Sequence, residues 1–435
     1  MEKLVSNWYK NVGSVPENYI FPAETRPGKF HVPMGEGIPV IDLSEAEEGH
    51  RTLTIQKILK ASQEFGFFQV INHGVSEKLM EETINVLKEF FQMPDEDKKH
   101  LYSEDFKNDC ILSTSCMNYG NEKVHQWRDF LKHSCHPLYK WQKFWPENPP
   151  TYREIVGACS VEVKKLSSRI LGLIAEGLGL ESGYFEDELS EHVALSAHQY
   201  PPCPDPTLTL GTRVHVDANI ITILLQDHVY GLQIFKDDTW LGVPPNPHAF
   251  VVNIGTFLQV ISNDKLKSVK HRVVTNTSKF RASAGFFVSA LEDTVIKPAR
   301  AVTDELNTAI YKPFTAKDFI MHYFQSDGDI EATIDQSFGG VNKLSISPPT
   351  LFDVIGEPPS IPYAMNYFHM MLHAVKPELF ANEDKIDNEV KWAKVYVQND
   401  TDSCRVHVLS WLQEWDGTVR DDAGYTMPRY YNGEL

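Results

Sequence analysis

The spacing of apolar residues in the first part of the chain predicts helices alternating with short strands. Residues 52–65 carry apolar side chains at helical spacing, and a glycine follows them, so a helix is predicted there with a strand over 67–71 directly behind it. The short apolar run at 38–43 has a proline at its second position, which favours a short buried or edge strand. Two further helices are predicted over 76–91 and from 152 to about 178.

The pattern changes from His198 onward, where short β-rich runs are separated by Gly, Asp, Asn and Pro. Many short strands at regular spacing are typical of a sandwich or barrel of the jelly-roll kind. Residues 94–150 hold scattered aromatic residues and prolines, which indicates loops and short strands lining a surface or pocket. The sequence thus predicts an α+β, mainly β fold with flanking helices, its later strands at 220–225, 232–235, 249–254, 258–261, 271–275 and 282–288.

The strand rhythm stops after Phe324. Paired glycines and prolines make 326–360 a predicted linker, and beyond it 392–397 and 405–412 can pair as a hairpin. We therefore expect three parts: an N-terminal region (1–160), a jelly-roll domain (161–325) and a C-terminal extension of unknown role (326–435), whose partner, if it has one, the sequence does not identify.

Composition narrows the classes of partner. The 435 residues are 42% apolar, enough for a full-sized core, and the formal charge of −18 repels phosphate backbones and anionic lipid headgroups. We expect no nucleic acid and no membrane among the partners, and no signal peptide, which favours a cytoplasmic location. The six cysteines lack paired metal-ligand spacing and are expected to be reduced thiols.

Three residues of the β-rich half form a candidate metal site. His215 and Asp217 stand two positions apart, and in an extended backbone such positions point to the same side. His271 lies on a later β-rich run that an antiparallel strand can return to the same end of a barrel. Two imidazoles and one carboxylate that leave other coordination positions open are the ligand set of non-haem Fe(II) oxygenases.

A second pair of residues gives an independent signal for an anion. Arg281 and Ser283 again stand two positions apart on a predicted strand, and they offer a guanidinium fork with a hydroxyl. An Arg fork is the natural bidentate partner of a carboxylate. A small diacid can therefore lie between this pair and the metal.

Taken with their neighbours, these residues carry a family resemblance. The chain resembles the plant Fe(II)/2-oxoglutarate-dependent dioxygenases of specialised metabolism. Within that family it is most similar in texture to hyoscyamine 6-hydroxylase and to the downy-mildew-resistance-type flavone and salicylate hydroxylases. The resemblance spans roughly residues 35–325 and rests on Tyr200-Pro201-Pro202-Cys203-Pro204, His215-Val216-Asp217, His271-Arg272-Val273, Arg281-Ala282-Ser283, Ile38-Pro39-Val40-Ile41-Asp42-Leu43, the run from Phe65 to Gly74, and Trp127-Arg128-Asp129.

The resemblance implies a double-stranded β-helix (a cupin-like jelly roll), Fe(II) on the His-Asp-His triad and 2-oxoglutarate chelating the iron through its keto acid end. Arg281 and Ser283 would bind the distal carboxylate and Tyr200 would donate to it. With O2, and with ascorbate as a reductant, 2-oxoglutarate would be converted to succinate while a small-molecule substrate is hydroxylated. Iron halogenases lack the carboxylate ligand, so Asp217 disfavours halogenation.

The sequence leaves the outcome of the oxidation and the substrate open. Desaturation, demethylation and ring closure are alternatives to hydroxylation of a ring-containing alkaloid or phenolic. His198 stands where relatives usually have Asn, Tyr230 where they have Pro, and the tail has no counterpart. These departures allow a different class of protein, a weakened relative that binds a small molecule or docks a partner.

Several other residues invite a functional interpretation that we consider weaker than a structural one. His73 lies in a turn before a helix and is expected to be structural. His133, Cys135 and His136 have no matched ligands elsewhere, so zinc is not expected there. Phe286 and Phe287 should point to opposite faces of a strand, and one of them is expected to form a pocket wall.

Overall fold

A computed structural model describes residues 3–325, apart from positions 31, 36, 106, 117, 118, 305 and 306, and excluding the side chains of residues 324 and 325. The predicted linker, hairpin and C-terminal extension lie outside this range. Within it, no helix is long and apolar enough to cross a membrane.

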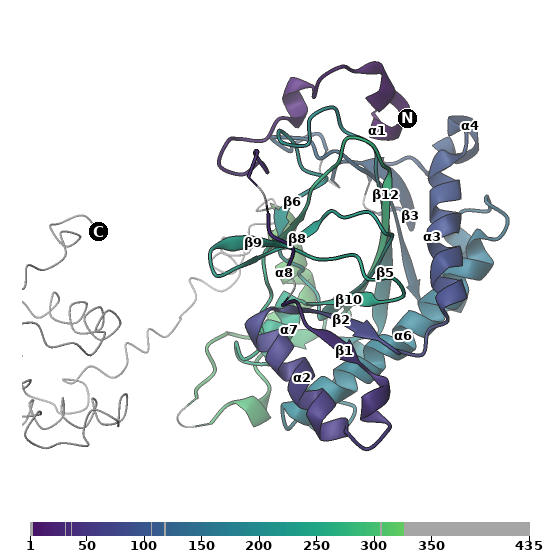
Figure 1. Ribbon diagram of the computed structural model, residues 1–435. Helices are drawn as coiled ribbons and strands as arrows, with labels where there is room; N and C mark the ends of the chain where they lie inside the picture. The colour runs from purple at the N-terminus through teal and green to yellow at the C-terminus, as the bar shows by residue number, and fades with distance from the viewer. Residues whose placement is uncertain are drawn as a thin grey trace, which may run out of the picture. The chain divides into compact units, whose positions relative to one another are not determined.

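Two sheets form the centre of the described part (Figure 1). The major sheet has the order β1-β2-β10-β7-β12-β5-β4-β3, and the minor sheet the order β6-β11-β8-β9. The strands are β1 (Val40–Asp42), β2 (Phe67–Ile71), β3 (Cys110–Thr114), β4 (Asp129–His136), β5 (His192–Tyr200), β6 (Thr212–His215), β7 (Ile221–Gln226), β8 (Leu232–Lys236), β9 (Thr239–Gly242), β10 (Phe250–Ile254), β11 (His271–Val273) and β12 (Arg281–Ser289), with β13 (Val295–Ile296) and β14 (Phe314–Thr315) as a separate pair.

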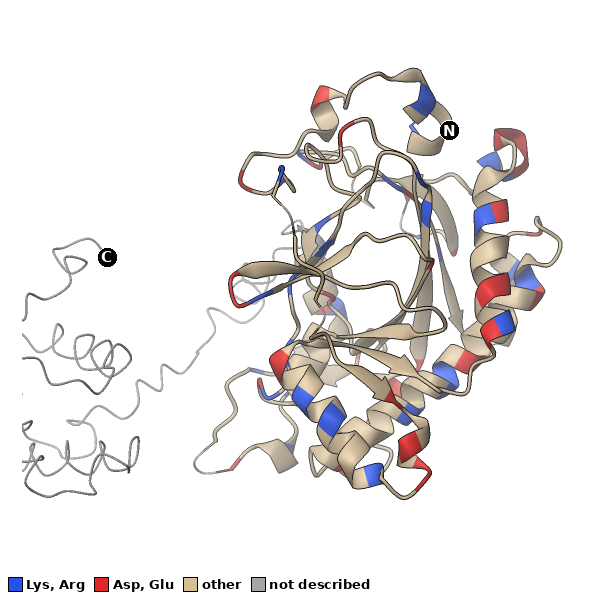
Figure 2. Ribbon diagram, viewed as in Figure 1, with Lys and Arg blue, Asp and Glu red and all other residues tan. Residues whose placement is uncertain are grey.

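Helices cover the outer face of the major sheet, and Figure 1 shows α2, α3 and α6 along it. The helices are α1 (Val5–Trp8), α2 (Arg51–Glu64), α3 (Glu77–Gln92), α4 (Asp95–Lys98), α5 (Leu138–Trp141), α6 (Tyr152–Gly177), α7 (Thr256–Ile261) and α8 (Ala316–Gln325). Acidic and basic residues lie along the exposed sides of the three long helices (Figure 2). The three long helices predicted from apolar spacing are confirmed to within one residue at each end.

Alternation along the strands gives the major sheet two different faces. The outer face buries Leu131, Leu195, Ile223 and Phe286 against the helices in the main core. The inner face contributes to a smaller cluster with the minor sheet, formed by Ile38, Phe67, Tyr200, Leu232, Ile234, Val243, Val251 and Val273. This arrangement of opposed sheets and flanking helices is the jelly roll that the sequence predicted. The helices cover only the outer face of the major sheet, so polar side chains can gather between the two sheets.

Two differences from the sequence prediction concern single elements. The predicted strand at 258–261 is wrong, because these residues belong to helix α7. Nearly every residue of α7 is buried, so the four-residue apolar run shows no alternation that distinguishes strand from helix. Strand β5 begins at His192, whereas the sequence pattern placed the start of the β-rich half at His198.

The boundary that the sequence suggested at residue 160 does not separate two sheets. Strands from both sides of residue 160 share the major sheet, and the proposed division into parts stays a prediction.

Candidate active site

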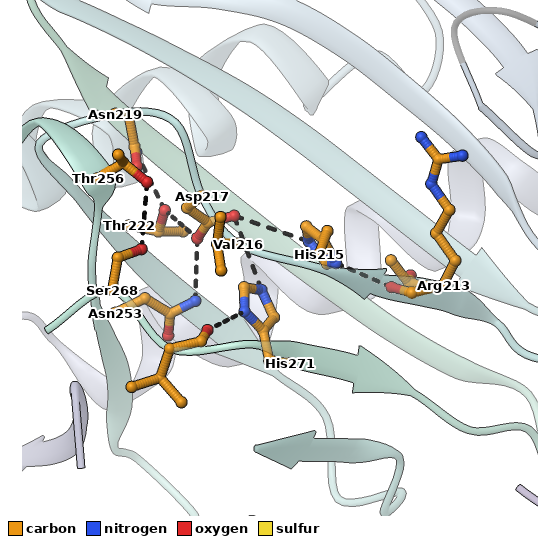
Figure 3. A network of polar contacts seen from close by, with 12 residues as sticks. Arg213, His215, Val216, Asp217, Asn219, Thr222, Asn253, Thr256, Ser268 and His271 are labelled. Carbon is orange, nitrogen blue, oxygen red and sulfur yellow. Dashed lines mark hydrogen bonds and ion pairs between the residues drawn. The ribbon is translucent and has the colours of Figure 1, made fainter. Parts of the chain in front are cut away.

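The structure brings the three predicted ligand residues together between the two sheets. His215 ends β6 and lies directly opposite His271 on β11, while Asp217 lies in the loop that follows β6. The three ligand atoms lie within 4.8 Å of one another. The Nε2 atom of each imidazole is 3.7 Å from Oδ1 of Asp217 (Figure 3). One ion can therefore contact all three side chains.

Backbone carbonyl groups orient both imidazoles. The Nδ1 group of His215 donates to the carbonyl of Arg213 at 2.9 Å, and that of His271 donates to the carbonyl of Val269 at 3.1 Å. These bonds place the proton on Nδ1 and leave the Nε2 lone pairs for a metal. Burial, together with the neighbouring His271, lowers the pKa of His215, so its imidazole is neutral.

Asp217 is held with one carboxylate oxygen free. Its Oδ2 atom accepts hydrogen bonds from Thr222 Oγ1 at 2.7 Å and from Asn253 Nδ2 at 3.0 Å, while Oδ1 faces the imidazoles. Burial alone would raise the pKa of Asp217, but the two histidines and these two hydrogen bonds outweigh it and lower the pKa. A carboxylate beside two imidazoles is a donor set that fits Fe(II).

The loop after β6 is fixed by helix α7. The backbone N–H of Thr256 donates to the carbonyl of Asp217 at 2.8 Å, and Gly255 donates to Ile220 at 2.9 Å. A Cβ atom at Gly255 would lie 2.0 Å from the carbonyl oxygen of Asn219, so only glycine fits at this approach. The helix that replaces the predicted strand thus positions Asp217, whose carboxylate is the candidate metal ligand.

Arg281 and Ser283 lie on β12 with side chains directed to the same inner face. Arg281 is only 1% exposed, and its guanidinium donates to the Val229 carbonyl at 3.1 Å, to Gln226 Oε1 at 3.0 Å and to Ser283 Oγ at 3.4 Å. All three acceptors are neutral, and no carboxylate of the described residues pairs with this buried charge. The Nε2 group of Gln226 is also buried without a hydrogen-bond partner. A buried cation beside an unused donor favours an anionic ligand.

Tyr200 lies beside this candidate anion site, opposite Arg281 on the neighbouring strand. Its ring lies 5.1 Å from the Arg281 guanidinium, and its hydroxyl is 3.1 Å from Thr212 Oγ1. Thr212 also accepts a hydrogen bond from Arg128 at 2.9 Å. Thr212 can therefore donate its proton to Tyr200, which leaves the phenolic O–H of Tyr200 able to donate to a ligand.

His198, which stands where relatives usually have Asn, lies opposite Ser283 across the β5–β12 pairing. It therefore faces the candidate anion site. Its Nδ1 atom is 3.4 Å from Nη1 of Arg128. Burial, followed by the charges of Arg128 and Arg281, holds the pKa of His198 well below its usual range. His198 is therefore a neutral hydrogen-bonding group and adds no positive charge.

Two other histidines have structural partners. His73 donates from Nε2 to the His248 carbonyl at 3.0 Å and accepts from the backbone of Val75 at 3.1 Å, which accounts for it as a turn residue. His133 points to the outer face, where its Nε2 atom is 2.9 Å from the hydroxyl of Tyr152.

The two aromatic positions that the sequence singled out also have clear places. Phe286 is buried in the main core, and Phe287 therefore faces the inner side, as alternation predicted. Tyr230 packs outside the barrel, where its hydroxyl accepts from Gln233 at 2.8 Å.

Sequence reasoning missed three residues that hold the candidate site residues in place: Thr222 and Asn253 beside Asp217, and Gln226 beside Arg281. Each is a polar residue at an inner position of a strand that otherwise reads as apolar. A polar residue in such a run is a usable signal, because a buried polar group needs a partner.

Comparisons with known proteins agree with this geometry. Residues 190–290 match the 2OG-Fe(II) oxygenase superfamily, and residues 38–148 match the N-terminal domain of non-haem dioxygenases in morphine synthesis. The chain is 43% identical to hyoscyamine 6-dioxygenase of Hyoscyamus niger and 42% identical to protein DOWNY MILDEW RESISTANCE 6 of Arabidopsis thaliana, in each case over 77% of this chain and 98% of the relative. Among solved structures, JOX2 in complex with 2OG, Fe and JA superposes with a TM-score of 0.67 at 33% identity, over 77% of this chain and 97% of that one.

Proposed function

Because the chain belongs to the 2-oxoglutarate- and Fe(II)-dependent oxygenases, we propose that it hydroxylates a small, ring-containing plant metabolite, either an alkaloid or a phenolic such as a flavonoid. The enzyme is a dioxygenase that uses Fe(II) and 2-oxoglutarate. A cytoplasmic location is part of the proposal and rests on the sequence alone.

In this proposal His215, Asp217 and His271 are the iron ligands. The observation that carries it is the convergence of the two imidazole Nε2 atoms and one free carboxylate oxygen within 4.8 Å. Bound iron and 2-oxoglutarate together supply an oxidant from O2, with 2-oxoglutarate converted to succinate and CO2. The protein holds these ligands in one geometry through the Arg213 and Val269 carbonyls.

The co-substrate is proposed to lie between the metal and Arg281. The buried guanidinium and the hydroxyl of Ser283 would bind the distal carboxylate, and Tyr200 would donate a further hydrogen bond. The uncompensated charge of Arg281 supports this assignment, since bringing a carboxylate there pairs a cation that is already desolvated.

Hydroxylation is the proposed outcome because Asp217 occupies the coordination position that halogenation needs for a halide. Its two hydrogen bonds, from Thr222 and Asn253, hold the carboxylate toward the metal. Neither histidine ligand is free to act as a general acid or base, and ascorbate as a reductant stays a prediction.

One spectroscopic experiment tests the metal and co-substrate sites. Anaerobic addition of Fe(II) and 2-oxoglutarate to the protein should produce a weak visible charge-transfer band. His271→Ala should remove the band and stop succinate formation without unfolding the protein, as judged by circular dichroism. A folded wild-type protein that gives no band would rule out the proposal.

The substrate class has a separate test. A panel of plant alkaloids and phenolics should contain compounds that stimulate succinate formation and are recovered one oxygen atom heavier. Products that have lost two hydrogen atoms or a methyl group would replace hydroxylation by desaturation or demethylation.

A further inference from the structure

The inner face of the major sheet contains a lysine level with the active site. Residues directly opposite on neighbouring strands share a face, and Lys132 on β4 lies opposite Ser196 on β5, which lies opposite Gly285 on β12. Gly285 follows Ser283 by two positions on that strand, so this row is adjacent to the row of the co-substrate site. The next row along contains Phe287 opposite Thr222, which holds Asp217. Lys132 is therefore level with the region between the co-substrate and the metal.

Lys132 makes no hydrogen bond and no ion pair within the described part of the chain, although its neighbours on the inner face include hydroxyl groups. It is half-buried, and burial lowers its pKa. A partly desolvated ammonium group with no partner costs stability. An anionic ligand at the inner wall would pair this charge.

Arg128 is a second cation on this face, four positions before Lys132. Its guanidinium donates to the Ser115 carbonyl at 2.7 Å and to Thr212 Oγ1 at 2.9 Å, and it lies 3.4 Å from His198. All of these partners are neutral. Phe130 stands between the two cations, 5.8 Å from the guanidinium, and presents an aromatic ring to the same space.

Negative charge does not balance these two cations. The five central strands β4, β5, β12, β7 and β10 carry no Asp or Glu on the inner face, and Asp129 points outward to bond the backbone of Val5 and Ser6. On the proposed function, bound Fe(II), the two charges of 2-oxoglutarate, Asp217 and Arg281 cancel one another. Arg128 and Lys132 then remain as uncompensated positive charge on the wall.

We propose that the substrate is an aromatic acid whose carboxylate binds the ammonium group of Lys132, with Arg128 adding to the positive field and the rings of Phe130 and Phe287 packing against the aromatic part. This inference rests on the proposed function and narrows it, because a protonated alkaloid would meet two like charges on this wall. It selects phenolic acids from the substrate classes left open by the sequence.

The test compares three ligands that differ mainly in charge. Affinities of 4-hydroxycinnamate (anionic), its methyl ester (neutral) and tyramine (cationic) are measured by calorimetry on the anaerobic Fe(II)-2-oxoglutarate holoenzyme. The wild type is expected to bind the carboxylate at least about tenfold more tightly than the other two, which is the effect of one desolvated charge pair. In Lys132→Met the three ligands should bind with about equal affinity, whereas Lys132→Arg should retain most of the preference for the carboxylate.

A matched control separates the site from a general charge effect. Lys78 on α3 has a side chain that is 82% exposed. Lys78→Met therefore removes one positive charge from the solvated surface, where water and salt screen it, and should leave the preference for the carboxylate ligand unchanged. Lys132→Met should fold at least as stably as the wild type, because it removes a desolvated charge without a partner.

Three results would overturn the inference: equal affinity of the wild type for all three ligands, failure of the carboxylate to bind, or a preference that survives in Lys132→Met. The charge-transfer band is recorded on the same samples. If the band forms and the carboxylate preference is absent, only the substrate inference fails, whereas absence of the band refutes the proposed function itself.

Discussion

The hydrogen bond from Thr222 to Asp217 provides the most direct test of how the metal site is built. Thr222→Val keeps the shape of the side chain and removes the hydroxyl that donates to Asp217 Oδ2 at 2.7 Å. The site is buried, so water cannot easily replace the lost donor. We expect weaker iron binding, because the carboxylate loses half of the support that keeps Oδ1 toward the imidazoles.

The magnitude follows from the charge on the acceptor. A hydrogen bond to an ionised group contributes about 1.5 to 3 kcal/mol, and partners of metal ligands change metal affinity by about 10- to 100-fold, which corresponds to about 1.4 to 2.7 kcal/mol. Asn253 still donates to the same oxygen at 3.0 Å, so the loss should fall at the lower end of this range.

The assay is an anaerobic Fe(II) titration at saturating 2-oxoglutarate, followed by the charge-transfer band. Thr256→Val serves as the control, because Thr256 lies beside the same loop but its hydroxyl contacts Ser268 at 3.4 Å and not Asp217. If Thr222→Val and Thr256→Val shift the iron Kd equally, or if neither shifts it more than twofold, the hydrogen bond does not hold the ligand.

Three further predictions concern other parts of the chain. Arg281→Met should weaken 2-oxoglutarate binding by about 30-fold, the effect of losing about 2 kcal/mol of charge pairing, while the iron Kd without co-substrate stays the same; calorimetry measures both. Burial lowers the pKa of His133 to about 4, below its value near 6.5 in the unfolded chain. The contribution of His133 to the free energy of unfolding is therefore fully present above pH 6.5 and falls by about 2 kcal/mol on going from pH 7.5 to 5. Urea unfolding at both pH values should show that the free energy of unfolding falls less between pH 7.5 and 5 in His133→Gln than in the wild type. Removal of residues 326–435 should leave succinate formation intact, and loss of folding on truncation would show that these residues complete the core.

The sequence predicts the long elements well because each has one buried face over many residues. Helix α3 and helix α6 have enough turns for apolar spacing to locate their ends, and the alternation in β12 separates Phe286 from Phe287. Helix α7 is predicted wrongly, since it is short and buried on almost all sides. The elements that fail are those in which tertiary packing leaves no periodic pattern.

In the candidate site, too, the sequence predicts the residues that are close in the chain and misses those that strand pairing brings together. His215 and Asp217 are visible in the sequence because their spacing in the chain is also their spacing in the site. Thr222 and Asn253 act on Asp217 from two other strands, and their role depends on strand register. Without an order of strands, no sequence pattern places either residue beside the carboxylate.

The net charge of the chain does not predict the sign of the charge inside the candidate site. The formal charge of −18 predicts that phosphate backbones and anionic lipids are repelled at the surface. Lys132 on β4, however, and Arg128, which directly precedes that strand, face inward, and the central strands place no acidic residue on this face. The inner wall therefore has the opposite sign. Screening by water weakens the surface charge over about 10 Å, whereas the desolvated wall acts at contact distance. An acidic protein can therefore select an acidic ligand, because strand alternation decides which charges the ligand meets.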